Sequence, residues 1–145
     1  MASRFHRGKF TVKNMDKYVG SKMPTYRSSW ESAFMQFCDS HPSVVKWASE
    51  CVKIPYRNPL TGKLSNYIPD FLVQYQDKKG NVVTELVEIK PKNQSIIESK
   101  NQNRRLAETV AVNHAKWEMA MRWCKQNGMR FRVVTEDDIF KSGSR

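Results

Sequence analysis

The sequence predicts a single α/β (α+β) domain in which helices flank a mixed central sheet. Two segments have hydrophobic residues at helical spacing, and three segments between them are rich in β-branched residues and separated by turn signals. The chain has 145 residues, of which 39% are hydrophobic, and this is enough for one domain around a single core. The expected order of elements is αβββαβ.

The first helix is expected to begin near Ser28. Residues 28–31 match the S-x-x-E capping box, and hydrophobic residues recur at helical spacing as far as Cys38. The helix should end by His41-Pro42. A short helical turn over residues 44–49 is expected to follow.

Three strands in a meander are expected next. The first covers residues 51–56, and turn residues at 57–63 return the chain antiparallel along residues 64–76. A hairpin signal at residues 77–81 precedes a third strand, rich in β-branched residues, at 82–89.

A longer helix is expected after Pro91 and should stop at Gly128. A short strand at residues 131–134 and a last helical turn capped by residues 135–138 complete the order. The core stripe of the long helix is expected to consist of Leu106, Val110, Trp117, Met121 and Cys124.

The charge of the chain predicts a polyanionic partner. Lys and Arg number 25 against 14 Asp and Glu, which gives a net charge of +11. Lys and Arg gain affinity for nucleic acid by displacing condensed counterions, so nucleic acid is the expected partner. A basic surface used only for solubility, or one that meets an anionic membrane, is the alternative.

Residues 1–27 are expected to form a basic N-terminal arm that settles on a duplex, or else a merely solvated tail. The globular domain would then span residues 28–140, followed by a short tail at 141–145. Three cysteines without a CxxC motif indicate neither a disulfide framework nor a zinc site. With no apolar run long enough for a membrane span or signal peptide, we expect a soluble, intracellular protein that is not secreted.

Two carboxylates and a lysine fall on neighbouring strands. Glu88 and Lys90 project from the same face at the end of their strand, and a hairpin partner can bring Asp70 beside them. Val87 and Ile89 flank Glu88 in a strand that otherwise has a core pattern. A carboxylate between two core residues is expected to bind a cation that neutralises its charge.

Mg²⁺ is the expected cation, with Mn²⁺ as a substitute, because it takes oxygen ligands and keeps several waters. Lys90 would position or help deprotonate the attacking water and offset charge in the transition state. Glu31, at the margin of the buried face of its helix, is a third candidate acid. The alternatives are an edge-strand ion pair between Glu88 and Lys90, and a purely capping role for Glu31.

These residues carry a family resemblance. Pro69-Asp70 followed by Glu88-Ile89-Lys90, with Glu31 on the preceding helix, resembles the PD-(D/E)xK nuclease superfamily. A closer resemblance, from Tyr26 to Asp137, is to the head-completion nucleases of tailed phages, which are similar to TnsA-type transposon endonucleases. Its flanking motifs are Tyr26–Glu31, Ile54-Pro55-Tyr56, Glu88–Lys92 and Phe131–Asp137.

The resemblance implies a restriction-endonuclease-like fold and a metal-dependent DNA endonuclease that acts during packaging or head maturation. It implies Asp70 and Glu88 as metal ligands, Lys90 as the catalytic lysine and Glu31 as the helix-borne acid, itself a metal ligand. Double-stranded DNA becomes the expected substrate, and phage head or neck proteins become candidate partners, in the host cytoplasm or the virion. The oligomeric state stays open.

Six basic residues are candidates for contact with DNA, although a run of charge on a helix is typically a solvated face. They are Arg27, Lys92, Lys100, Arg104, Arg105 and Lys116. The chief rival function is a non-catalytic DNA-end binder or structural head-assembly protein on a nuclease fold. An RNA-binding module is disfavoured because the aromatic motifs for base stacking are missing from the sequence.

Overall fold

The computed structural model describes residues 7–91 and 103–138. Its elements are β1 (Gly8–Lys9), β2 (Thr25–Tyr26), α1 (Ser29–Ser40), β3 (Val44–Ser49), β4 (Ile54–Arg57), β5 (Leu64–Tyr67), β6 (Phe71–Gln76), β7 (Val82–Ile89), α2 (Arg104–Gln126) and β8 (Arg130–Val134). No helix in these residues is both long enough and apolar enough to cross a membrane.

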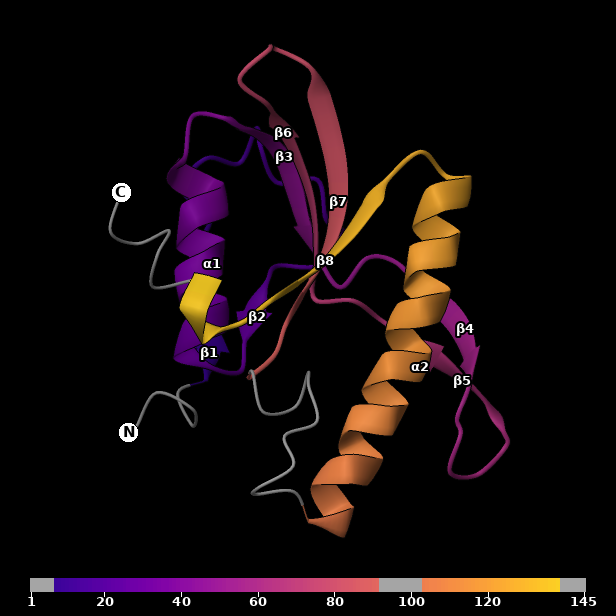
Figure 1. Ribbon diagram of the computed structural model, residues 1–145. Helices are drawn as coiled ribbons and strands as arrows, with labels where there is room; N and C mark the ends of the chain where they lie inside the picture. Colours follow the sequence, from indigo (N-terminus) through magenta and orange to yellow (C-terminus); the bar gives the residue numbers. More distant parts are fainter. Residues whose placement is uncertain (1–6, 92–102, 139–145) are drawn as a thin grey trace.

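The central sheet has the strand order β3-β6-β7-β8. β3, β6 and β7 pair antiparallel, whereas β8 pairs parallel to β7 after the chain crosses over through α2. α1 and α2 lie on opposite sides of this sheet (Figure 1). The predicted mixed sheet flanked by helices is confirmed.

The sheet separates two hydrophobic clusters, and strand alternation assigns each side chain to one of them. Val87 and Ile89 belong to the cluster on the α1 side, and Leu86 belongs to the cluster on the α2 side. Glu88 lies between Val87 and Ile89 and therefore points to the α2 side, as Leu86 does. This register carries the carboxylate to the face where the site is built.

Two secondary-structure assignments made from the sequence are wrong. Residues 44–49 form β3 and not a helical turn, because they pair along β6 and bury Trp47 in the core. The expected strand at 64–76 is broken into β5 and β6 around Pro69, which has no N–H to donate to a ladder. The expected first strand lies in β4, which forms a separate hairpin with β5.

The αβββαβ order nevertheless holds for the central sheet, because β3 takes the place expected for residues 51–56. The helix ends also agree with the sequence. Ser28 caps α1 by accepting the N–H of Glu31 at 3.1 Å, and Gly128, with φ of 68°, follows the end of α2. Met121 was predicted to belong to the core stripe of the long helix, and this prediction is wrong because the residue is 54% exposed. Val110, Trp117 and Cys124 of the same stripe are buried.

Residues 7–27, expected as a basic arm, pack on the core. Val12 and Tyr18 are buried in the α1-side cluster. The carbonyl of Lys17 and the N–H of Val19 bond to the backbone of Trp47 and so cover the outer edge of β3. This described part is therefore not a solvated tail, and the domain boundary at residue 28 stays a prediction.

Candidate active site

A cleft of about 470 Å³ opens at the end of β7. It brings together all four residues predicted to be catalytic, which come from α1, from the start of β6 and from the end of β7. Its lining residues are Arg27, Glu31, Glu50, Asn66, Tyr67, Ile68, Asp70, Glu88, Ile89, Lys90 and Lys116.

Asp70 is placed by the antiparallel register of β6 and β7. Phe71 pairs with Val87, so Asp70 lies opposite Glu88. Its Oδ2 accepts the backbone N–H of Ile89 at 2.8 Å, and the residue is only 7% exposed. Burial raises the pKa of Asp70 well above its ordinary value of 3.8, and the charge of Glu88 raises it further.

Glu88 is held by groups on three sides. Its Oε1 accepts the hydroxyl of Tyr67 at 2.8 Å and the N–H of Asp70 at 3.3 Å, while its Oε2 lies 3.6 Å from Nζ of Lys90. Burial raises the pKa of Glu88, and Lys90 lowers it in part. The Glu88–Lys90 ion pair exists, but it is not an edge-strand pair, because β7 lies between β6 and β8.

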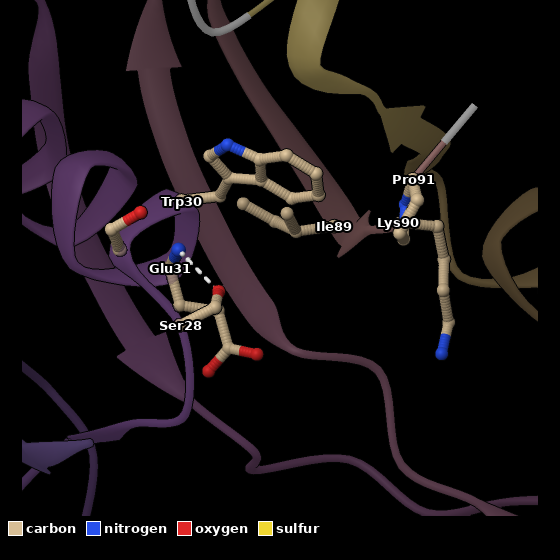
Figure 2. A pocket seen from close by; sticks show the side chains of 7 residues that line it. Ser28, Trp30, Glu31, Ile89, Lys90 and Pro91 are labelled. Carbon is tan, nitrogen blue, oxygen red and sulfur yellow. Dashed lines mark hydrogen bonds between the residues drawn. The ribbon is translucent and has the colours of Figure 1, made fainter. Parts of the chain in front are cut away.

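Glu31 lies in the first turn of α1, and its side chain also reaches the cleft. Its N–H bonds to Ser28, and its Oε1 accepts the N–H of Arg27 at 3.0 Å. The carboxylate also lines the main cleft and a smaller pocket of about 230 Å³ beside it. Figure 2 shows this pocket, in which the indole of Trp30 lies over Ile89. The Ser28 half of the predicted capping box is confirmed, whereas the Glu31 carboxylate accepts the N–H of Arg27, one residue before the N-cap, instead of that of Ser28. A metal role for Glu31 stays a prediction.

Arg27 extends its guanidinium among the acids of the cleft. Its Nη2 lies 2.9 Å from Oε2 of Glu50 and 3.4 Å from Oδ1 of Asp70. A second atom, Nε, is 3.7 Å from Oε1 of Glu31. In this structure Arg27 thus neutralises part of the site, and its contact with DNA stays a prediction.

Sequence reasoning missed Glu50 and Tyr67. Glu50 follows β3 with a φ of 49°, and no motif marks it. Tyr67 stands three residues before Asp70, and a buried tyrosine usually finds a partner for its hydroxyl, so a partner for Tyr67 could have been expected. Tyr67 keeps Glu88 oriented from the end of β5.

The six predicted DNA contacts are spread unevenly. Lys116 lines the cleft, with Nζ 5.8 Å from the ring centroids of both Tyr56 and Tyr67. Arg104 and Arg105 are exposed at the start of α2, about 17–18 Å along the helix from Lys116. The predicted contacts Lys92 and Lys100 lie outside the described residues.

Whether a hard cation fits the cleft depends on its donor atoms. Within the described ranges, no three His, Cys, Asp or Glu side chains are arranged to hold a metal ion. The fit therefore depends on the Asp70–Glu88 pair, whose buried carboxylates repel each other and both have a raised pKa. Two oxygen ligands and several retained waters are a suitable shell for Mg²⁺.

Comparison with known proteins gives two matches. Residues 41–136, which include Asp70, Glu88 and Lys90 but not Glu31, match the TnsA-like endonuclease N-terminal family. The chain is also similar to the head completion nuclease of Enterobacteria phage T4, with 33% identity over 142 residues that cover 91% of this chain and 92% of that protein. The two matches confirm the resemblance to head-completion nucleases and TnsA-type endonucleases, and the chain belongs to the TnsA-like endonuclease family.

Proposed function

We propose that the protein is a metal-dependent DNA endonuclease of the PD-(D/E)xK type that hydrolyses phosphodiester bonds. One observation supports this above others: Asp70 and Glu88 are buried opposite each other in an open cleft, with Lys90 beside them. A surface that only bound DNA would gain nothing from acids at the point where phosphates must approach.

The residues have separate tasks in the proposed reaction. Asp70 and Glu88 would hold Mg²⁺ or Mn²⁺, with Glu31 as a further ligand, and the bound ion would act as a Lewis acid and lower the pKa of a water. Lys90 would position the attacking water and offset negative charge on the phosphate. The N–H of Ile89 and the hydroxyl of Tyr67 keep the two carboxylates in place.

The biological role that we propose is phage head completion, in which the enzyme acts on DNA during packaging or head maturation. Support comes from the similarity to the head completion nuclease of phage T4 over nearly the whole of both chains. Head or neck proteins are the proposed partners. A structural DNA-end binder with the same fold is the competing function.

Cleavage of supercoiled, linear and branched DNA in Mg²⁺, Mn²⁺ or EDTA separates these functions. We expect metal-dependent cutting by the parent and loss of cutting in Asp70→Asn and Lys90→Ala. Matched controls are Asp16→Asn and Lys125→Ala, which change exposed residues away from the cleft. DNA binding without cutting in any metal would favour the structural role.

A further inference from the structure

We propose that the β4–β5 hairpin is a DNA-contacting element that holds the duplex beside the scissile phosphate and favours duplexes interrupted by a gap or a branch. The proposal rests on the nuclease function proposed above and names its substrate class. Figure 1 shows the hairpin packed beside α2, separate from the central sheet.

The two faces of the hairpin differ in chemistry. Ile54, Tyr56 and Tyr67 are buried against α2. The register places Arg57 opposite Leu64 on the other face, and Leu64 is 70% exposed. No part of the described chain covers this outer face, although the face presents a large aliphatic side chain beside a cation.

This outer face is continuous with the cleft. Asn66 and Ile68 line the cleft, and Ile68 is 40% exposed. Leu64 lies on the same face as Asn66, about 7 Å further along the strand. A duplex with its scissile phosphate at Glu88 would therefore meet the outer face within a few base pairs.

The positive charge of the hairpin segment favours DNA as the partner that binds its outer face. Between Cys51 and Pro69 the chain has Lys53, Arg57 and Lys63 and no acidic residue. A polyanion is attracted to such a segment. Pro55, which has no N–H, interrupts the hydrogen-bonding capacity of β4, so an added protein strand is a poorer fit.

The turn is built to hold its exposed side chains. The carbonyl of Asn58 accepts the N–H of Gly62 at 2.8 Å, and its Oδ1 accepts the N–H of Leu60 at 2.8 Å. Leu60 is 52% exposed at this turn. If Leu60 or Leu64 inserts between two stacked bases, the bases must first be unstacked, which costs free energy. This cost is smallest where a gap or a branch already interrupts the stacking.

The test measures DNA binding without cleavage, in EDTA. Probes are an intact duplex and the same duplex with a one-nucleotide gap and 2-aminopurine beside it. Leu60→Ser/Leu64→Ser should lose a preference of about three- to tenfold for the gapped duplex, together with the 2-aminopurine signal. Arg57→Gln/Lys63→Gln should weaken binding to both duplexes and lower the salt slope by about 0.9 for each phosphate that is no longer neutralised.

Val82→Ser and Lys125→Gln are the matched controls, since both residues are exposed away from the hairpin. The proposal is overturned if the hairpin variants bind both duplexes as the controls do, or if the parent has no preference for the gap. Cleavage is measured separately with Mg²⁺. Absent cleavage with intact hairpin effects would refute the nuclease function alone, and normal cleavage without hairpin effects would refute this inference alone.

Discussion

The carboxylate of Asp70 accepts the backbone N–H of Ile89, with 2.8 Å between Oδ2 and N. This bond fastens the start of β6 to the residue between Glu88 and Lys90. An amide side chain at position 70 can retain the bond, whereas a methyl group leaves a buried N–H unpaired. The two substitutions therefore separate charge from structure.

Asp70→Asn is expected to stabilise the metal-free protein by about 1 kcal/mol, because it removes the repulsion between Asp70 and Glu88 and keeps an acceptor for Ile89. Asp70→Ala should instead destabilise it by about 1–3 kcal/mol for the unpaired N–H. In thermal melts in EDTA, the melting temperature should be highest for Asp70→Asn, intermediate for the parent and lowest for Asp70→Ala. Adding Mg²⁺ or Mn²⁺ should raise the melting temperature of the parent but scarcely that of Asp70→Asn. An equal rise in both proteins would place the ion elsewhere.

The stability of the metal-free protein should fall as pH rises through the titration of Asp70 and Glu88. Both pKa values are raised above their ordinary 3.8 and 4.5, so the folded state holds these protons more tightly than the unfolded state does. Stability is therefore greatest below the ordinary values and is lost as pH rises to the raised ones. The advantage of Asp70→Asn should vanish in acidic buffer, and melts across pH check this. A constant advantage would show that Asp70 keeps an ordinary pKa.

Glu31→Gln should leave stability within about 0.5 kcal/mol of the parent, because glutamine still accepts the N–H of Arg27, and the half-exposed guanidinium of Arg27 keeps Glu50 and Asp70 as partners. If Glu31 is a ligand, the Mg²⁺ concentration for half-maximal cleavage should rise. Unchanged metal dependence would leave Glu31 with a capping role alone. Glu31→Ala, which removes both functions, is the comparison variant.

Asp39 is expected to anchor the N-terminal segment. Its two carboxylate oxygens accept the N–H groups of Lys13 at 2.9 Å and Asn14 at 3.1 Å, and the residue is only 3% exposed. Asp39→Ala should cost about 2–4 kcal/mol, and Asp39→Asn about half as much because one acceptor remains. Urea unfolding measures this, with Asp16→Asn as the control. Equal midpoints for Asp39→Ala and the control would show that the segment is not docked.

The catalytic acids could be placed from the sequence because their positions follow from local rules. Strand alternation puts Glu88 and Lys90 on one face, and a hairpin brings Asp70 across from them. β3 was missed because both of its faces are covered, so Trp47 and Ala48 are buried side by side and no alternation appears.

Glu50 and Arg27 could not be assigned from the sequence for a different reason. Their ion pair joins residues 23 positions apart through the packed N-terminal segment. Neither residue belongs to a periodic pattern or a spaced motif that would indicate the contact. The basic composition around Arg27 indicated a contact with DNA, which stays a prediction, and gave no sign of the carboxylates that surround its side chain in the fold.

The position of β7 between two paired strands has a consequence for hydrogen exchange. Amides in the middle of a sheet exchange with solvent only when the whole domain unfolds, whereas the two-stranded β4–β5 unit can exchange through local opening. Deuterium uptake should therefore be slowest around Glu88 and faster around Leu64. Glu88 is therefore carried by the part of the backbone that opens last, whereas undocking of the adjoining hairpin from α2 would take the hydroxyl of Tyr67 away from this carboxylate.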